Sequence, residues 1–395
     1  MKLDIPTKRF DDAFISFIQK YLNVIYFAII TIIGIILRNN FRGYLSGDMA
    51  CCIQPWTEHL KNNGGFLGIK TLETNYSVMY QYILAFISYF PGSTIAKAKV
   101  VNWVFDFLTA VFVGLFVAKL KNRPKFSFIP ILAYTIALFI PTGILNSSLW
   151  GQCDIIYTSL VLISVYLFTE DRFGWSFVVF GLALSFKLQA IFLLPLFIIF
   201  YIKTREFSII HFLYLPIVYI LVYLPAFLLG KPFSQIFREY TIQVGNYPSM
   251  VLNFTNLYAL LPDDYELFAF PAILISLTAL GFLGFMVISL EKLKLTGNKI
   301  TELALIVSIV TVYFLPSMHE RYMFMADFFA IIYLFIKPKH FFIPFIIWSI
   351  NTMTYLPYLF GLQPWFDYRA IALILFGILI FMVHDFFNNN SHISE

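Results

Sequence analysis

The segment YLNVIYFAIITIIGIIL, residues Tyr21–Leu37, is followed closely by GDMACCIQPW, residues Gly47–Trp56. The first segment is almost wholly apolar. Its length is close to the about 20 residues that an α-helix needs to cross a bilayer. The second opens a polar loop that runs to about Asn75, and its early acid is Asp48. Such an acid at a membrane surface could be a general base or an ordinary loop aspartate, and this stretch alone leaves both readings open.

The composition places the whole chain in a membrane. Of 395 residues, 60% are hydrophobic and 12% are charged, whereas soluble domains carry about 25% charge. Aromatic residues make up 19% of the chain, as suits lipid-facing helices and interfacial belts. No basic patch with interleaved aromatics indicates a nucleic-acid partner. Three cysteines, two of them adjacent, do not form a disulfide framework. We therefore predict an all-α, polytopic integral membrane protein.

Hydropathy divides the chain into about twelve transmembrane helices within one domain, residues 1–395. The predicted spans are Tyr21–Leu37, Val100–Ala118, Phe126–Leu145, Ile155–Phe168, Phe173–Phe186, Ala190–Ile202, Ser208–Leu229, Leu267–Leu290, Ile300–Leu315, Tyr322–Ile336, Phe341–Tyr358 and Tyr368–Phe386. The apolar stretch 76–90 is too short to cross, and we expect it to lie in the outer interface as a helix. The sequence shows no cleavage site after Lys20, so we expect the first span to be retained.

Positive charge sets the expected orientation. Short basic connectors face the cytoplasm, and four connectors are basic: 119–125, 203–205, 292–299 and 337–339. The connectors between them then face outward, with both termini cytoplasmic and two long outer loops, about 38–99 and about 230–266. This alternation requires 173–202 to be two short passes that turn near Lys187, although one long tilted helix is the alternative. A bacterial plasma membrane is favoured.

Polar residues gather in the outward connectors. Trp150, Gln152 and Asp154 follow the third span and could contact a substrate, or could form a polar loop with an aromatic anchor. Lys187 and Gln189 interrupt an apolar run, where an ionisable group is costly and is a candidate functional residue. The alternative is that Lys187 extends to the lipid headgroups.

The connector PSMHERY, residues 316–322, is the densest charged cluster beside a span on this face. Arg321 can hold a phosphate through two hydrogen bonds, and His319 can donate a proton near neutral pH. Glu320 could pair with either residue. A short turn with a local salt bridge is the structural alternative.

These stretches, in this order, resemble those of the GT-C glycosyltransferases. The resemblance is closest to bacterial relatives of the enzyme that adds the second mannose to GPI anchors. It rests on three motifs spread over most of the chain. They are Gly47-Asp48 with Pro55-Trp56, Asn62–Gly65 and Asn75-Tyr76; Leu149–Asp154 with Phe186–Gln189; and His319–Tyr322. An aromatic residue commonly follows the first-loop acid in this family, whereas here Met49 does.

The resemblance implies a GT-C-like fold with interfacial helices in the first outer loop, and an inverting hexosyl transfer with mannose as the favoured sugar. The donor would be a polyprenyl-phosphate sugar and the acceptor a glycan or glycolipid in contact with membrane lipids. It implies Asp48 as catalytic base and Arg321, His319 and Lys187 as ligands of the donor phosphate. The residues implied to bind sugar or acceptor are Asp154, Gln152, Trp150, Trp56, Gln189 and Glu320.

Other functions remain open at this stage. A flippase or transporter for a lipid-linked sugar would also suit twelve spans, and a glycan polymerase would also act at the outer face. Transporter sites lie near the bilayer midplane, whereas the polar clusters here lie at one face. A divalent metal, Mg²⁺ or Mn²⁺, is left open because the sequence presents no dedicated set of ligands.

Overall fold

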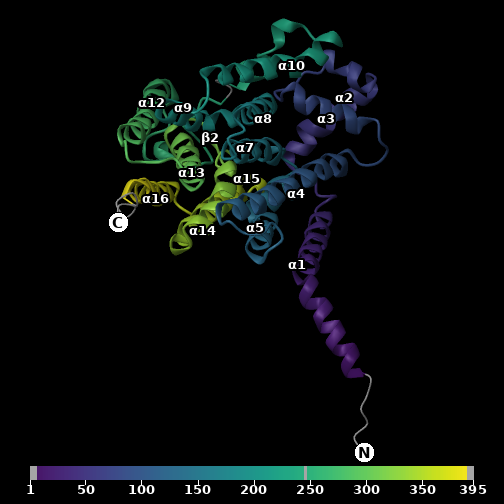
Figure 1. Ribbon diagram of the computed structural model, residues 1–395. Coiled ribbons are helices and arrows are strands. Elements are labelled where there is room, and N and C mark those ends of the chain that lie inside the picture. Colours follow the sequence, from purple (N-terminus) through teal and green to yellow (C-terminus); the bar gives the residue numbers. More distant parts are fainter. Residues whose placement is uncertain (1–6, 244–246, 389–395) are drawn as a thin grey trace, which may run out of the picture.

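The fold is helical almost throughout. The computed structural model describes residues 7–243 and 247–388 (Figure 1). Its helices are α1 (Thr7–Asn40), α2 (Gln54–Asn62), α3 (Val78–Ser88), α4 (Thr94–Leu120), α5 (Phe128–Phe139), α6 (Pro141–Gly143), α7 (Asp154–Phe168), α8 (Phe173–Phe186), α9 (Leu194–Thr204), α10 (Tyr214–Leu228), α11 (Arg238–Gln243), α12 (Tyr265–Ser289), α13 (Gly297–Phe314), α14 (Phe324–Ile336), α15 (Phe342–Phe360) and α16 (Tyr368–Asn388).

Between the helices lie short turns and two short strands. The strands β1 (Val251–Leu252) and β2 (Met318–His319) pair in parallel. The 3₁₀ turns cover Gly65–Lys70, Leu188–Leu193, Ile209–Leu213, Phe233–Gln235, Leu257–Leu260 and Pro338–His340, and π-helical turns cover Met49–Ile53 and Ile144–Trp150.

The structure confirms an all-α membrane protein at the level of helix length and composition. Six helices are long and apolar enough to cross a membrane, and the pair α5 and 141–150, bent by 45°, would make a seventh. The other helices in the predicted spans are shorter or less apolar. At about 1.5 Å per residue, the 15 residues of α7 extend about 22 Å, less than the about 30 Å of a hydrocarbon core. Twelve crossings therefore stay a prediction, although a helix occupies each predicted span.

Two local expectations can be compared directly with the helices. The alternative of one long helix over 173–202 is wrong, because α8 ends at Phe186 and Lys187 is extended, with φ −151° and ψ 133°. The chain resumes as α9 after a 3₁₀ turn, so the break lies where the sequence placed it. In the stretch 76–90, α3 has 11 residues, too few to cross a bilayer.

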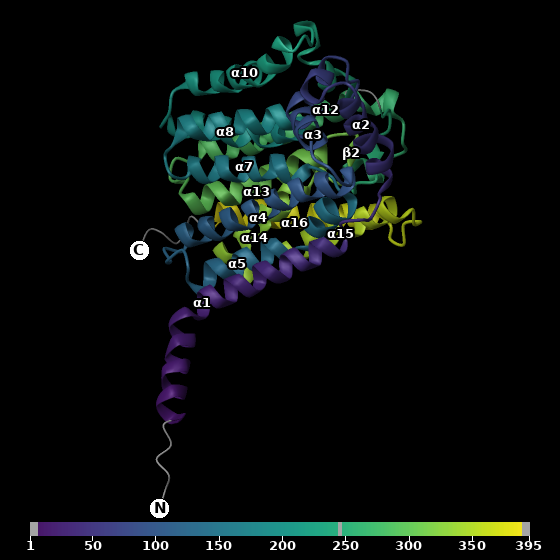
Figure 2. The same ribbon diagram turned by 90° about the vertical axis from the view of Figure 1, so that its right-hand side faces the viewer.

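The basic connectors lie together at one end of the long helices. Lys119, in the last turn of α4, pairs with Glu170, after α7, at 2.6 Å. Lys203, in the last turn of α9, donates to the carbonyl of Leu290, after α12, at 2.7 Å. Figure 2 shows α16 ending at this same end, away from α2, α3 and β2.

A partly buried ionic cluster around the buried Glu302 lies at this end of the bundle. Lys337 bonds the carboxylates of both Glu302 and Asp385, and Lys299 lies 3.5 Å from Glu302. These residues come from α13, α16 and the connector after α14, so the cluster joins three separate helices. The basic connectors therefore gather at one end of the bundle, and which side of the membrane this end faces stays a prediction.

The two long loops cover the opposite end. Loop one contributes α2 and α3, and the second loop contributes α11 and β1; residues 244–246 of this loop lie outside the described residues. Buried Lys231 donates to Gln81 at 3.0 Å and pairs with buried Glu239 at 3.2 Å. Gln81 lies in α3 and Glu239 in α11, so this network fastens the second loop to the first.

The helices differ in how much of their apolar surface is buried inside the protein, from the central helices to those that face lipid. In α13, 78% of the apolar window is buried inside the protein, against 6% in α1. Figure 2 shows α13 among α7, α4 and α14, whereas α1 runs along the outside and its first turns leave the bundle. A peripheral α1 can stay apolar all round because its surroundings are lipid.

One ion pair joins α1 to the bundle. Arg38 and Asp106 are each nearly inaccessible, and their side chains meet at 2.8 Å. Arg38 also donates to the carbonyl of Leu138 at 2.9 Å, and Asp106 accepts from Ser147 at 2.6 Å. Since α1 leads directly into Gly47–Trp56, this contact fixes where loop one begins.

Replacing Asp106 by Asn should destabilise the protein by about 3–5 kcal/mol, because it leaves the buried Arg38 charge without its counter-ion. The double variant Arg38→Met, Asp106→Leu should recover most of that loss, since a buried ion pair and an apolar pair are often similar in stability. SDS-induced unfolding in mixed micelles measures both. Equal destabilisation by the single and double variants would contradict this account.

Candidate functional site

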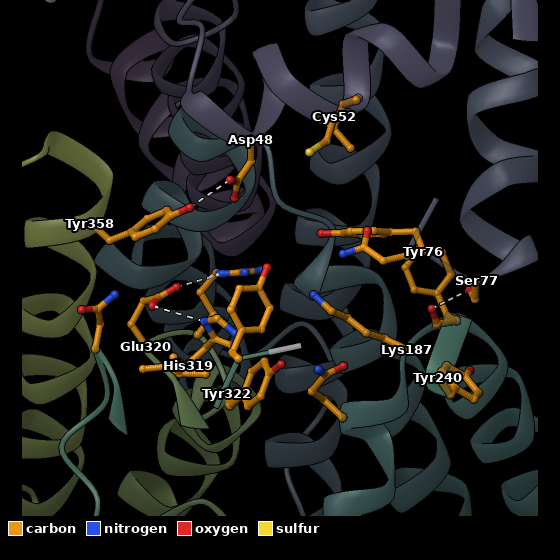
Figure 3. A pocket seen from close by; sticks show the side chains of 18 of the residues that line it. Asp48, Cys52, Tyr76, Ser77, Lys187, Tyr240, His319, Glu320, Tyr322 and Tyr358 are labelled. Atoms are coloured by element: carbon orange, nitrogen blue, oxygen red, sulfur yellow. Dashed lines mark hydrogen bonds and ion pairs between the residues drawn. The ribbon is translucent and has the colours of Figure 1, made fainter. Parts of the chain in front are cut away.

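A cavity of about 350 Å³ opens at the loop-covered end of the helices (Figure 3). Residues from all three motifs line it, together with residues of the second long loop. The lining consists of Asp48, Cys52, Ile53, Trp56, Asn75, Tyr76, Ser77, Phe186, Lys187, Gln189, Tyr240, Tyr247, Leu252, Asn253, His319, Glu320, Arg321, Tyr322 and Tyr358. Charged groups and aromatic rings thus line the same cavity.

The carboxylate of Asp48 is held by donors from two other parts of the chain. Its Oδ2 accepts from Trp150 Nε1 at 2.9 Å and from Gln152 Nε2. Its Oδ1 accepts from the hydroxyl of Tyr358 at 3.1 Å. Figure 3 shows Asp48 and Tyr358 joined on one side of the cavity. These bonds fix the orientation of the carboxylate, and Oδ1 keeps room for a further donor because each carboxylate oxygen has two lone-pair directions.

The turn that carries Trp150 and Gln152 packs tightly under loop one. The π-helical turn ends at Gly151, whose φ of +82° favours glycine. A Cβ atom there would also lie 2.6 Å from the sulfur of Met49. The hydroxyl of Ser46 donates to the Trp150 carbonyl at 2.5 Å, so this turn is bonded to the start of loop one at Ser46 as well as at Asp48.

A buried lysine holds the same two segments together. Lys99 is fully buried, and its ammonium donates to the carbonyls of Phe41 at 2.9 Å, Tyr44 at 2.7 Å and Leu149 at 2.9 Å. A lysine ammonium has three donors, and all three are used here. Lys99 therefore ties the end of α1 to the turn before α7.

Asp154 lies beneath the cavity and joins the second motif to the third. This buried carboxylate bonds Lys187 through Oδ1, and through Oδ2 it accepts from Asn146 at 2.9 Å and lies 3.4 Å from Arg321. Gln152 Oε1 accepts from Arg321 at 2.9 Å. Both predicted phosphate-binding cations therefore have a carboxylate partner inside the protein.

Glu320 gives Arg321 a second counter-ion. Its Oε1 lies 3.1 Å from Arg321 Nε, and Nδ1 of His319 lies 3.9 Å from its Oε2. Burial raises the pKa of Glu320, but the neighbouring His319 and the charge of Arg321 outweigh burial and hold the pKa below its usual value.

The second long loop positions His319 from its other side. β1 pairs with β2 so that Leu252 lies opposite His319, and Ser317 donates its backbone N–H to Met250 at 3.0 Å. The imidazole contacts the rings of Tyr247 and Tyr322 at centroid distances of 5.1 and 5.2 Å. Both long loops thus contribute to one cavity.

The structure brings all the predicted site residues into one region. Asp48, Trp56, Lys187, Gln189, His319, Glu320 and Arg321 line the cavity, and Trp150, Gln152 and Asp154 lie directly behind them. The last three hold lining residues in place, whereas the sequence assigned them to substrate binding. The catalytic and binding roles themselves stay predictions.

Several site residues were not predicted from the sequence. Tyr358, which bonds Asp48, ends a predicted span on the outward side, and this position was the only signal for it. Lys99 stands at the start of an apolar run, where an ionisable residue is notable. Asn102, one turn later, donates to the Gln152 carbonyl at 2.9 Å, and nothing in the sequence distinguished it.

A metal ion was left open by the sequence. Within 7–243 and 247–388, no three residues among His, Cys, Asp and Glu lie together as ligands for a metal ion. A role for Mg²⁺ or Mn²⁺ stays untested.

In comparisons with known proteins, no family model matches the chain and no curated protein matches it. The similarity to the GT-C glycosyltransferases therefore stays a prediction from the motifs, and the geometry of the cavity has to carry the functional argument.

The lowered pKa of Glu320 predicts how stability depends on pH. A carboxyl group whose folded pKa lies below its unfolded value stabilises the protein above the unfolded pKa, and this stabilisation is lost as the pH falls through the folded pKa. Replacing Glu320 by Gln should therefore destabilise by about 1–3 kcal/mol at pH 6, and the difference should shrink below pH 4.5, the ordinary value.

Unfolding in mixed micelles between pH 3 and 7 measures this difference. Glu58→Gln is the matched control, because Glu58 lies in α2 outside the cavity and bonds only Gln54 among the described hydrogen bonds. A Glu320→Gln effect that stays constant, or grows, as the pH falls would refute the assignment.

Proposed function

We propose that the protein is an integral membrane glycosyltransferase that transfers a hexose, with mannose favoured, from a polyprenyl-phosphate donor to a glycan or lipid-linked acceptor. The observation that carries the proposal is the cavity, in which the oriented carboxylate of Asp48 lies across from Lys187 (Figure 3). A second cation, Arg321, lines the same cavity. Glycosyl transfer from a phosphate needs a base for the acceptor and positive charge for the leaving group.

Asp48 is the proposed base. Its Oδ1, with one bond from Tyr358, can accept a hydrogen bond from an acceptor hydroxyl. As that oxygen bonds to the anomeric carbon, its proton passes to Asp48, the bond from carbon to phosphate oxygen breaks and the electron pair leaves with the phosphate. One displacement of this kind inverts the anomeric centre. General-base help of this type contributes about 10²–10⁴ in rate.

Arg321 and Lys187 are the proposed groups that stabilise the leaving phosphate. The hydrogen bonds of Arg321 use Nε and Nη1, and Nη2 has no hydrogen-bond partner among the described residues. A guanidinium with an unused N–H edge is suited to a phosphate oxygen. Lys187 lines the cavity although its ammonium also bonds Asp154.

The remaining walls suit a sugar. Trp56, Tyr76 and Tyr358 present aromatic rings to the cavity. Gln189 is buried, and its Oε1 has no hydrogen-bond partner among the described residues. An unpaired acceptor in a buried site is costly, and a sugar hydroxyl could donate to it.

The orientation of the chain follows from the same proposal. The basic connectors meet at the end opposite the cavity, and basic connectors face the cytoplasm. The cavity then opens on the extracytoplasmic face, with both termini cytoplasmic, and a bacterial plasma membrane is the favoured location.

A flippase or transporter for a lipid-linked sugar is the rival from another functional class. It would use a polar site that is exposed alternately on both faces, commonly near the midplane. The cavity lies at one end of the helices, which favours the enzyme. A glycan polymerase would share this end, and differs in requiring a longer lipid-linked glycan as donor.

Replacing Asp48 by Asn should lower transfer by at least about 10²-fold, since Asn has no basic oxygen to accept the proton. Purified protein is assayed for labelled product and released polyprenyl phosphate. Asp171→Asn is the matched control: Asp171 lies at the opposite end and has φ +59°, a conformation that Asn tolerates. Transfer at the wild-type rate by a folded Asp48→Asn protein would exclude the assigned base.

Single-cysteine labelling tests the orientation. With the three native cysteines replaced by serine, Asn63→Cys should react with an impermeant maleimide added outside intact cells, because Asn63 is exposed in loop one. Lys121→Cys, exposed in a basic connector, should react only after the membrane is opened. The reverse pattern would invert the proposed topology.

A further inference from the structure

Helix α1 is longer than a membrane crossing requires. Its 34 residues extend about 51 Å at about 1.5 Å per residue, against about 30 Å for a hydrocarbon core. The stretch 21–37, between Lys20 and Arg38, carries no charge, and its length is close to the about 20 residues that a crossing takes. The turns before Lys20 therefore extend beyond the hydrocarbon core.

These first turns also leave the bundle. Along α1 from its start, Asn23 makes the first described hydrogen bond to another element, to the carbonyl of Phe126 at 2.9 Å. Figure 2 shows α4, α13 and α14 running across the view, whereas the first turns of α1 run crosswise to them. They do so at the end where α16 ends. A helix that lies crosswise at one end of the spans runs along the membrane surface.

One face of these turns is aromatic. Phe10, Phe14, Phe17 and Tyr21 follow one another at spacings of four, three and four residues, which places them on one side of a helix. In this aromatic stripe, the ring centroids of Phe10 and Phe14 lie 6.3 Å apart, and those of Phe17 and Tyr21 lie 4.8 Å apart. All four residues are 38–71% exposed, so the described part of the protein leaves the stripe uncovered.

The opposite face is polar. Asp12, Ser16 and Gln19 repeat at spacings of four and three residues, and all three are exposed. Lys20 lies next to the stripe, with its ammonium 5.2 Å from the ring centroid of Tyr21. A helix with one apolar aromatic face and one charged or polar face is suited to lie in a membrane interface, with its apolar side about 5–10 Å into the boundary between headgroups and acyl chains.

The stripe suits a lipid surface better than a second helix. A coiled coil is indicated by apolar positions that repeat over at least three or four heptads, whereas residues 10–21 cover fewer than two. Aromatic residues are enriched at membrane interfaces. The stripe also continues directly into the span, in which exposed side chains such as Ile29 and Ile33 face lipid. Contact with the membrane therefore covers the stripe without a partner protein.

We propose that residues 10–21 form a surface anchor, in which the aromatic stripe lies in the lipid headgroup region and Asp12, Ser16 and Gln19 face water. The apolar face binds the same bilayer that α1 crosses. Because the anchor is continuous with the span, it fixes the depth at which Tyr21 lies and α1 enters the hydrocarbon core. This inference does not rest on the proposed transferase, and it holds for either orientation of the chain.

Spin labels on the full-length protein in vesicles of phosphatidylcholine and phosphatidylglycerol test the anchor. The three native cysteines are replaced by serine, and a single labelled cysteine is placed in turn at each position from 10 to 21. Molecular oxygen, which partitions into lipid, and a water-soluble nickel chelate report the surroundings of each label. We expect oxygen accessibility to peak at 10, 14, 17 and 21, and chelate accessibility to peak at 12, 16 and 19.

Two reference labels give the limits of this scale. Ile33 is exposed in the span and reports lipid, and Lys121 is exposed in a connector and reports water. Chelate accessibility at every position from 10 to 21 would overturn the inference, because these turns then stand in water. Low accessibility to both reagents along the stripe would also overturn it, because protein, such as a second copy of the chain, then covers the stripe.

Removing aromatic rings supplies an independent check. With the label kept at position 14, the double variant Phe10→Ser, Phe17→Ser should shift the label from the lipid limit towards the water limit, because the stripe loses the rings on both sides of it. The matched polar-face variant Asp12→Ser, Gln19→Ser should leave the label where it is. The Ile33 label confirms that the span stays inserted in both variants. Equal shifts in the two variants, or no shift in the first, would contradict the anchor.

Discussion

The buried carboxylate of Asp154 is the interaction on which the site depends. It bonds Lys187, accepts from Asn146 and lies 3.4 Å from Arg321, so it joins the break between α8 and α9 to the connector before α14. A buried charge is stable only when paired and hydrogen-bonded. Both cations of the cavity are therefore paired with one acid that does not line the cavity itself, and Arg321 is held by Glu320 and Gln152 as well.

Buried polar contacts hold the rest of the site in place as well. Lys99 donates to three carbonyls in the segments that precede Asp48 and Trp150, and Trp150 donates to Asp48. Arg38, in the last turn of α1, fixes the start of loop one through its ion pair with Asp106. These polar contacts lie where helices end, and apolar packing of α13 and α14 holds the helices in register behind them. A catalytic group held in this way needs little reorganisation during a reaction.

The helix positions and the grouping of polar residues could be predicted because both have strong one-dimensional signals. Apolar runs mark the helices, and the break at Lys187 was visible because a charge interrupts such a run. Alternating basic connectors were enough to place Asp48, Lys187 and Arg321 at one end of the bundle. Helix lengths were less predictable: short helices such as α7 pack inside the protein, so hydropathy alone does not determine which of them cross.

The partners of each side chain could not be predicted, because they depend on distances between segments far apart in the sequence. Asp154 was expected to contact a substrate, and its pairing with Lys187 and Arg321 was not foreseen. Tyr358 was expected only to end a helix, and its bond to Asp48 was not foreseen either. Arg321 pairs with both Asp154 and Glu320, and no residue pattern shows that these two acids meet at one guanidinium. Chemistry that depends on such details requires coordinates.

The most direct test of the central claim is transfer by the purified protein in proteoliposomes. It is supplied with polyprenyl-phosphate mannose or glucose, labelled in the sugar, and with glycan and lipid acceptors. The account predicts labelled product together with free polyprenyl phosphate. Intact labelled lipid that crosses the bilayer without any transfer would contradict it, and would make the cavity one end of a transport path.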